Sequence, residues 1–277
     1  MARVVFVVHP ERPPARELAN QAITWLDDRG HQGRIHGEGP AGTSRDLTGS
    51  NLAVSLGGDG TMLRTVVLAS RSGVPVLGVD FGRLGYLTEV EPSGLDSALE
   101  RFLSGRFTLE ERMTLSVEIQ SNSRSTSLLA LNEAAIEKTE PGHTIRVATS
   151  IGGKHFVTYT GDGLIVATPT GSTAYNLSVR GPVVSPSVRA FVLTPVAPHL
   201  VFDRSLVLDT SEWLRMELVG PRPAALVIDG QTVAQIHPGD VVECRKGEHP
   251  ARLVTFGQRD FHAILRDRFH LANTPES

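Results

Sequence analysis

Two short segments rich in glycine and threonine each follow an apolar run. The first, residues 57–61 with the sequence GGDGT, comes directly after residues 52–56. The second, residues 168–175 with the sequence TPTGSTAY, comes directly after residues 164–167. Apolar runs of this length, bounded by turn-forming residues, predict buried strands. Backbone N–H groups become free where a strand ends, and such places bind phosphate and ribose. The two segments therefore predict nucleotide chemistry.

The glycines of GGDGT allow a phosphate to approach the backbone, because no Cβ stands in the way. They also let the backbone reach positive φ angles, which glycine adopts without strain. Apolar residues at 62, 63, 66 and 67 follow with helical spacing. The segment therefore ends at a helix N-terminus, where free amides and the helix dipole favour an anion.

The GGDGT segment also contains a carboxylate, which phosphate binding alone does not explain. Asp59 would repel phosphate unless it holds a cation or takes a proton from an attacking hydroxyl. The second role is that of a kinase base. A tight turn with an N-capping aspartate is the alternative interpretation.

The composition favours a small-molecule enzyme of a reducing compartment. The 277 residues carry a formal net charge of -3 with no run of lysine or arginine, which gives no electrostatic case for nucleic acid or an anionic membrane. The lone cysteine, Cys244, cannot form an internal disulfide. The apolar run at residues 4–8 is too short for a signal peptide or a membrane span. We expect a cytoplasmic protein.

The periodicity changes near residue 110. Before it, apolar runs alternate with helical stripes, which predicts an α/β N-terminal domain with a largely parallel sheet over residues 1–110. After it, residues 115–120 alternate between apolar and polar, Gly152-Gly153 is a hairpin signal, and further short strand candidates follow. We therefore expect a β-rich C-terminal domain over residues 111–256. In residues 257–277, an amphipathic helix should pack back on the first domain.

Taken together, the motifs resemble those of the NAD kinases, which phosphorylate NAD to NADP with ATP. The resemblance depends on GGDGT, on Asn132-Glu133 and on residues 161–178, with smaller matches at residues 85–88 and 229–231. GGDGT alone is shared with diacylglycerol-kinase-like lipid kinases and, in variant form, with phosphofructokinases, whereas the 161–178 block is not. The resemblance implies a phosphofructokinase/diacylglycerol-kinase-like first domain and a homodimer or homotetramer.

The family also implies roles for individual residues. Asp59 would activate the 2′-hydroxyl of the adenosine ribose of NAD. Phosphate-binding positions are Gly57, Gly58, Gly60, Thr61 and Arg64, although a solvated helix position is the alternative for Arg64. NAD-binding positions are Asn132, Glu133, His143, Asp162, Thr173, Ala174, Tyr175, Ser178 and Gln231. Mg²⁺ or another divalent cation would accompany ATP without protein ligands of its own.

Three positions depart from the family pattern. Asp80 stands where many members carry Asn, Asn176 where Ser is usual, and Val179-Arg180 where Ala-Gly is usual. These residues flank the expected pocket, so a paralogue that phosphorylates another nucleoside or polyol is one alternative. A non-catalytic sensor of NAD(P)(H) is a second. A lipid kinase is disfavoured, because no amphipathic or basic membrane face is visible.

Overall fold

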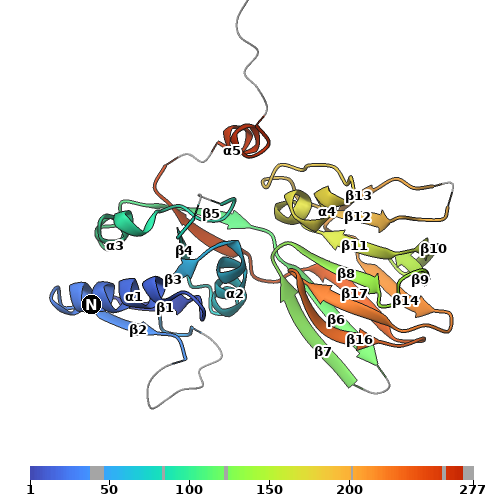
Figure 1. Ribbon diagram of the computed structural model, residues 1–277, viewed down its shortest axis with the longest axis horizontal. Helices are drawn as coiled ribbons and strands as arrows, with labels where there is room; N and C mark the ends of the chain where they lie inside the picture. Colours follow the sequence, from blue (N-terminus) through green and yellow to red (C-terminus); the bar gives the residue numbers. More distant parts are fainter. Residues whose placement is uncertain (38–46, 83–84, 122–123, 201, 258–259, 271–277) are drawn as a thin grey trace, which may run out of the picture. The chain divides into compact units, whose positions relative to one another are not determined.

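The computed structural model describes residues 1–37, 47–82, 85–121, 124–200, 202–257 and 260–270, and divides into two compact units (Figure 1). Unit 1 is Met1–Glu111 with Arg252–Ser277, and unit 2 is Arg112–Ala251. The strand β18 (Ala251–Thr255) belongs to the sheet of unit 1. From the sequence, these residues are expected in the β-rich domain of residues 111–256. The apolar pattern of a short strand does not indicate which sheet the strand joins.

Unit 1 is an α/β unit with a six-stranded sheet in the order β2-β1-β3-β4-β18-β5. Its other strands are β1 (Arg3–Val8), β2 (Gln32–Ile35), β3 (Leu52–Gly57), β4 (Val76–Asp80) and β5 (Thr108–Arg112). The pairs β1–β2, β1–β3, β3–β4 and β4–β18 are parallel, which confirms the expected largely parallel sheet. Its helices are α1 (Pro13–Asp27), α2 (Asp59–Ser70), the 3₁₀ turn η1 (Pro92–Gly94), α3 (Leu95–Leu103) and α5 (Phe261–Arg268).

The apolar runs explain this layer. Every residue of β3 and β4 is buried, as expected for central strands of a parallel sheet covered by helices. Phe6, Leu26 and Leu99 from three elements are fully buried in one core cluster. Each such side chain contributes about 1.5–3 kcal/mol by leaving water.

The central strands of unit 1 end at one edge of the sheet. In the pairing register, Val8 of β1 lies opposite Leu56 of β3, and Gly57 of β3 lies opposite Asp80 of β4. Parallel strands end on the same side, so the segments that follow them share this edge. In open α/β sheets this is the edge where ligands bind.

Unit 2 contains two six-stranded sheets, in the orders β10-β9-β14-β17-β6-β7 and β13-β12-β11-β8-β15-β16. The first contains β6 (Leu115–Ser121), β7 (Arg124–Ala130), β9 (Ile145–Ile151), β10 (Lys154–Gly161), β14 (Leu214–Val219) and β17 (Val241–Lys246). The second contains β8 (Glu133–Lys138), β11 (Gly163–Ala167), β12 (Ala190–Val196), β13 (Leu206–Asp209), β15 (Ala224–Ile228) and β16 (Gln231–Ile236). All pairs in both sheets are antiparallel, and the expected β-rich domain is confirmed.

Alternating side chains from both sheets form the core of unit 2. Val117 and Met216 of the first sheet share one buried cluster with Ile136 and Phe191 of the second. The hairpin between β9 and β10 turns at Gly152 and Gly153, whose φ angles of 57° and 82° fit the tight turn expected there.

The helix α5 is short, and none of its residues is buried. Asp260 caps it, because the Asp260 carboxylate accepts the N–H groups of His262 and Ala263. Phe261, Ile264 and Leu265 are only half-buried, so the apolar face expected to pack on the first domain is partly covered. Among the described residues, no helix is long and apolar enough to span a membrane.

Candidate active site

The GGDGT loop connects β3 to α2. Gly57 ends the strand, Gly58 is the N-cap of α2 and Asp59 begins the helix. None of the three glycines has a positive φ, so the turn from strand to helix does not use this freedom and is made with φ angles open to any residue. What glycine supplies here is space. A Cβ at Gly57 would overlap the side chain of Thr61, whereas a Cβ at Gly58 or Gly60 would have no atom within 4 Å.

Two consequences follow for the phosphate-binding positions. Gly58 and Gly60 leave their backbone open at the N-terminus of α2, which suits the close approach of a phosphate. Thr61 is buried and packs on Gly57, so it fixes the loop from within.

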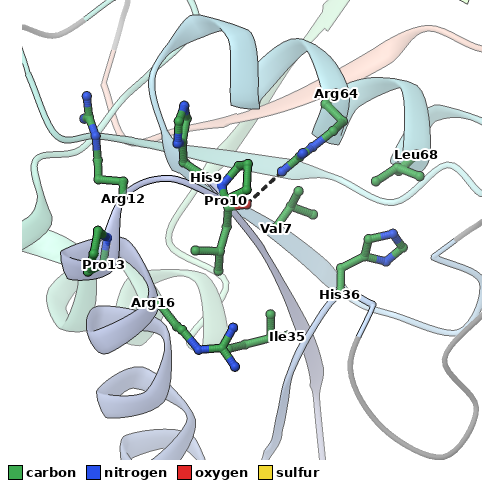
Figure 2. Close-up of a pocket in the computed structure, with 11 residues that line it drawn as sticks. Val7, His9, Pro10, Arg12, Pro13, Arg16, Ile35, His36, Arg64 and Leu68 are labelled. Carbon is green, nitrogen blue, oxygen red and sulfur yellow. Dashed lines mark hydrogen bonds between the residues drawn. The ribbon is translucent and has the colours of Figure 1, made fainter.

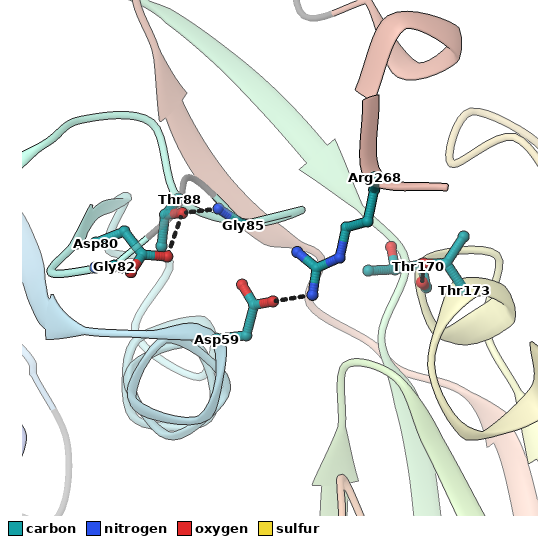
Figure 3. A network of polar contacts seen from close by, with 8 residues as sticks. All are labelled: Asp59, Asp80, Gly82, Gly85, Thr88, Thr170, Thr173 and Arg268. Atoms are coloured by element: carbon teal, nitrogen blue, oxygen red, sulfur yellow. Dashed lines mark hydrogen bonds and ion pairs between the residues drawn. The ribbon is translucent and has the colours of Figure 1, made fainter. Parts of the chain in front are cut away.

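Asp59 lies beside Arg268 of α5 (Figure 3). One carboxylate oxygen of Asp59 is 3.9 Å from Nη2 of Arg268, and the Asp59 side chain is 36% exposed. Gly85 lies against the same carboxylate, and a Cβ there would be 2.9 Å from its Cγ. The Arg268 guanidinium also lies 4.8 Å from the ring centroid of Tyr86. Burial and the charge of Asp59 raise the pKa of Tyr86, and Arg268 opposes this rise. The phenol is therefore neutral near pH 7.

Asp80 organises the segment that brings Gly85 to Asp59. Its carboxylate accepts the Gly82 N–H at 2.8 Å and the Thr88 hydroxyl at 3.1 Å (Figure 3). The Gly85 N–H in turn donates to the Thr88 hydroxyl at 2.7 Å. Asp80 is itself buried, and this departure from the family pattern holds the loop together.

A cavity of about 530 Å³ opens at the carboxyl end of β1 (Figure 2). It is lined by Val7, Val8, His9, Pro10, Arg12, Pro13, Arg16, Ile35, His36, Arg64 and Leu68. The Arg64 guanidinium donates to the Val8 carbonyl at 2.7 Å, which fixes this predicted phosphate ligand at the cavity wall. Burial and the nearby charges of Arg34 and Arg64 lower the pKa of His36.

In unit 2, the backbone of Asn132-Glu133 is held by Asp229. The Asp229 carboxylate accepts the N–H groups of Leu131 and Asn132 at 2.8 Å each and that of Glu133 at 3.1 Å. Asp229 and Gly230 have positive φ angles of 48° and 78° in the turn between β15 and β16. Residues 229–231 match the family pattern, but the sequence analysis does not predict a role for Asp229. The feature that could have indicated one is an aspartate in a two-residue hairpin turn, because aspartate tolerates the left-handed conformation.

Glu133 is a buried acid. Only 4% of the residue is exposed, and its Oε2 has no hydrogen-bond partner in the part of the chain that the structure describes. Burial raises its pKa to about 8, and the nearby charges of Asp229 and Glu137 add to this rise, while a backbone hydrogen bond from Tyr175 opposes it. The group is therefore mostly protonated near pH 7, so it is a hydrogen-bond donor as well as an acceptor.

The TPTGSTAY segment supports Asn132-Glu133 from the other side. It forms the 3₁₀ turn η2 (Thr170–Thr173) and the short helix α4 (Tyr175–Ser178). The Thr168 hydroxyl donates to the Leu131 carbonyl at 2.6 Å, and the Thr168 N–H donates to the Asn132 carbonyl at 2.8 Å. A Cβ at Gly171 would overlap the backbone of Asn132. Much of the hydroxyl content of this segment therefore serves local structure.

The remaining predicted NAD-binding residues fall into two groups. Burial raises the pKa of Tyr175, and a side-chain hydrogen bond with Glu137 adds to this rise. The charges of Glu137, Asp162 and Glu133 act in the same direction, so these groups lie near the Tyr175 hydroxyl. Asp162 pairs with Lys138 at 2.7 Å. Thr173 and Ala174, which precede Tyr175 in the chain, are partly exposed. Three more of these residues are exposed: Ser178, His143 and Gln231. The side chains of His143 and Gln231 make no hydrogen bond with any described residue. Gln231 pairs with Ile228, which pairs in turn with Ala134, so Gln231 lies near Glu133 in the second sheet.

The two other departures from the family pattern differ in kind. Asn176 is fully buried, and its amide donates to the carbonyls of Ser172 and Pro182 and accepts from the Thr194 hydroxyl at 2.7 Å. It is therefore a structural cross-link. Arg180 is exposed with a positive φ of 66°.

Comparison with known proteins agrees with these motifs. Family models described as the ATP-NAD kinase N-terminal domain and C-terminal domain match residues 40–107 and 131–256. The chain is 40% identical to an NAD kinase of Heliobacterium modesticaldum, over 97% of this chain and 98% of that protein. It is 35% identical to an NAD kinase of Geobacter sulfurreducens over the same shares. The crystal structure of an NAD kinase from Archaeoglobus fulgidus in complex with ATP is similar at a TM-score of 0.74 and 27% identity, over 97% of each chain. Yeast NADH kinase complexed with NADH shares the fold at a TM-score of 0.88 and 23% identity, over 100% of this chain and 89% of that one.

Proposed function

Because the chain belongs to the NAD kinase family and catalyses the ATP-dependent phosphorylation of NAD, we propose that Asp59 is the base of this reaction. The observation that carries the proposal is the place of its carboxylate. Asp59 begins α2 between two glycines whose backbone is open, and its side chain is partly exposed at the carboxyl edge of the sheet. A base and a phosphate cradle therefore stand next to each other in one short segment.

In the proposed step, Asp59 takes the proton from the 2′-hydroxyl of the adenosine ribose. The hydroxyl oxygen attacks the γ-phosphorus of ATP, the bond from that phosphorus to the β,γ-bridging oxygen breaks, and ADP leaves with the bond electrons. Free N–H groups at the N-terminus of α2 stabilise charge on the transferred group. Mg²⁺ bound to ATP would neutralise part of the phosphate charge. A carboxylate oxygen such as that of Asp59 is a suitable ligand for this cation. The described residues contain no group of three or more His, Cys, Asp or Glu that would hold a metal by themselves.

The proposed contacts to NAD come from unit 2. Asn132 and the protonated Glu133 carry donors and acceptors that match a ribose diol and an adenine edge. Tyr175 and Asp162 supply a ring and a carboxylate beside them. Thr173, Ala174 and Ser178 are proposed as the surrounding wall. His143 and Gln231 remain proposals from the family resemblance.

The alternatives of a changed acceptor and of a non-catalytic sensor make different predictions. Asp80 and Asn176 are engaged within the protein, which leaves Arg180 as the departure open to a ligand. The test is to incubate the protein with Mg-ATP and NAD and to assay NADP with an NADP-specific dehydrogenase. ADP formed only with another nucleoside or polyol would indicate a changed acceptor. Nucleotide binding without ADP formation would indicate a sensor.

We further propose a cytoplasmic homodimer or homotetramer. Unit 2 exposes Phe156 and Phe202, whose rings contact each other edge to face, together with Val207 and Val233. Exposed apolar side chains of this size support self-association. The buried Cys244 fits a reducing compartment, because no disulfide holds the fold. Light scattering coupled to gel filtration measures the assembly.

A further inference from the structure

The backbone of Arg180 has a conformation that arginine rarely adopts. Its φ angle is 66°, in the left-handed region, and only four non-glycine residues in the described part of the chain have a positive φ. Arg180 is the second residue after the end of α4, at a place where glycine commonly ends a helix in this conformation without strain. The turn alone therefore does not explain an arginine at this position.

The surrounding structure holds this turn in place. The Arg180 N–H donates to the Leu177 carbonyl at 3.0 Å, and the Gly181 N–H donates to the Asn176 carbonyl at 2.8 Å. A Cβ at Gly181 would overlap the amide of Asn176, which is itself buried and bonded to the Thr194 hydroxyl. Because the turn is fixed from both sides, the strain at Arg180 persists. Strain that is kept in this way is typical of functional sites.

The Arg180 side chain is available to a ligand. It is exposed, and it makes no hydrogen bond or ion pair with any residue that the structure describes. Tyr175 and Val179 pack on the same apolar cluster of the second sheet, so the turn at Arg180 directly follows the short helix that carries Tyr175. Ser178, one of the proposed NAD contacts, is two residues before Arg180.

The proposed NAD-binding group of unit 2 has carboxylates close to Tyr175. Glu137 and Asp162 lie near its hydroxyl. Lys138 lies beside them, but its charge is paired with Asp162 at 2.7 Å. Carboxylates repel the negatively charged pyrophosphate of NAD, so its binding here calls for a further cation. A guanidinium suits this role, because it binds phosphate through charge-assisted hydrogen bonds in a planar, bidentate geometry.

We propose that the Arg180 guanidinium binds the pyrophosphate of NAD, at the phosphate next to the adenosine. Thr173 and Ser178, on the same segment, are proposed to surround the adenosine, so the phosphate attached to it is the one closest to Arg180. The affinity gained from this contact offsets the strain of the turn. This inference rests on the proposed function and adds to it a residue that recognises the acceptor.

Arg180→Gly separates the side chain from the turn, because glycine adopts the left-handed conformation without strain. The midpoint of urea unfolding should therefore not fall below that of the wild type. The KM for NAD should nevertheless rise about tenfold, as expected for the loss of one charge-assisted hydrogen bond, while kcat and the KM for Mg-ATP stay within about threefold. Arg180→Lys should retain part of the affinity. A KM for NAD equal to that of the wild type in Arg180→Gly would overturn the proposal.

Calorimetry with AMP and adenosine tests the contact with phosphate directly. Arg180→Gly should weaken AMP about tenfold and leave the Kd for adenosine within about threefold. Equal losses for both ligands would overturn the phosphate contact. Arg180→Gln is compared with Arg189→Gln, since Arg189 is also exposed in unit 2 and makes no hydrogen bond or ion pair with a described residue, but has no positive φ. An equal loss of AMP affinity in these two variants would overturn a specific role for Arg180.

Two further results distinguish this proposal from its alternatives. Light scattering coupled to gel filtration should give the same assembly for the wild type and Arg180→Gly. A changed assembly together with unchanged AMP affinity would assign Arg180 to a contact between subunits and overturn the proposal. The calorimetry needs no turnover, so it tests Arg180 even if the wild-type protein forms no NADP, a result that would refute the proposed function separately.

Discussion

Arg268, eight residues into the last helix, places its guanidinium 3.9 Å from the carboxylate of Asp59, although 209 positions separate them in the sequence. The same guanidinium stacks on Tyr86 at 4.8 Å. Both charged side chains are partly exposed, so the pair contributes only about 0–1 kcal/mol to stability. Because this contact costs so little to break, we expect Arg268 to exchange the carboxylate of Asp59 for a phosphate group when ATP binds.

Arg268→Gln should therefore lower kcat about tenfold or more, because a cation next to the transferred phosphoryl group stabilises the charge of the transition state. Steady-state kinetics with NAD and Mg-ATP measure this. Arg266→Gln removes a cation from the same helix without touching Asp59 and is the control. Arg268→Lys should retain more activity than Arg268→Gln. Equal kinetics in the Arg266 and Arg268 variants would contradict the role.

Asp59→Asn should reduce turnover by about 10²–10⁴-fold, since the amide cannot accept the proton of the ribose hydroxyl. The Kd for NAD should change only a few-fold. NADP formation and calorimetry measure the two quantities, with the exposed Asp96→Asn of α3 as control. A loss of NAD affinity as large as the loss of turnover would show that Asp59 binds substrate rather than acting as base.

The strand and helix positions that carry the chemistry could be predicted, because they depend on local pattern. Buried apolar runs ended by GGDGT and TPTGSTAY do lie where strands end. The conformation of the loop could not be predicted, because three glycines permit positive φ without requiring it, and the actual constraint is the Thr61 side chain packed on Gly57.

Residues that meet through the fold left no signal in the sequence. In the sequence, Arg268 is one of several charged residues on an amphipathic helix, and no local pattern predicts its contact with Asp59. The five basic residues of the cavity at the end of β1 come from four segments, and none of these segments is unusual by itself. The sequence predicts that Asp80 flanks the substrate pocket. In the structure its carboxylate accepts hydrogen bonds from Gly82 and Thr88 of the loop that follows it.

Asp229→Ala should destabilise unit 2 by several kcal/mol. The change leaves three backbone N–H groups of residues 131–133 without their acceptor, and each such loss costs about 1–3 kcal/mol where the group is buried. Urea unfolding measures the free energy, and Asp229→Asn should be milder because it keeps one acceptor oxygen. The control is Asp209→Ala, since the Asp209 carboxylate accepts the Ser211 N–H in an exposed turn. Similar losses at both positions would contradict the support proposed for Asn132-Glu133.

Glu133 makes stability depend on pH in a direction opposite to that of an ordinary salt-bridged acid. Burial raises its pKa from 4.5 in the unfolded chain to about 8 in the native state, so between these values the native state binds the extra proton. The contribution of the neutral acid to stability is fully present below about pH 4.5 and is lost as pH rises through about 8. Glu133→Gln stays neutral throughout. Urea unfolding at each pH should therefore show the free energy of unfolding of this variant rising relative to that of the wild type between about pH 6 and about pH 8, by up to about 1.4 kcal/mol per pH unit at 25 °C. The exposed Glu140→Gln should follow the wild type at every pH. A constant difference between wild type and Glu133→Gln across this range would show that Glu133 is already ionised in the native protein.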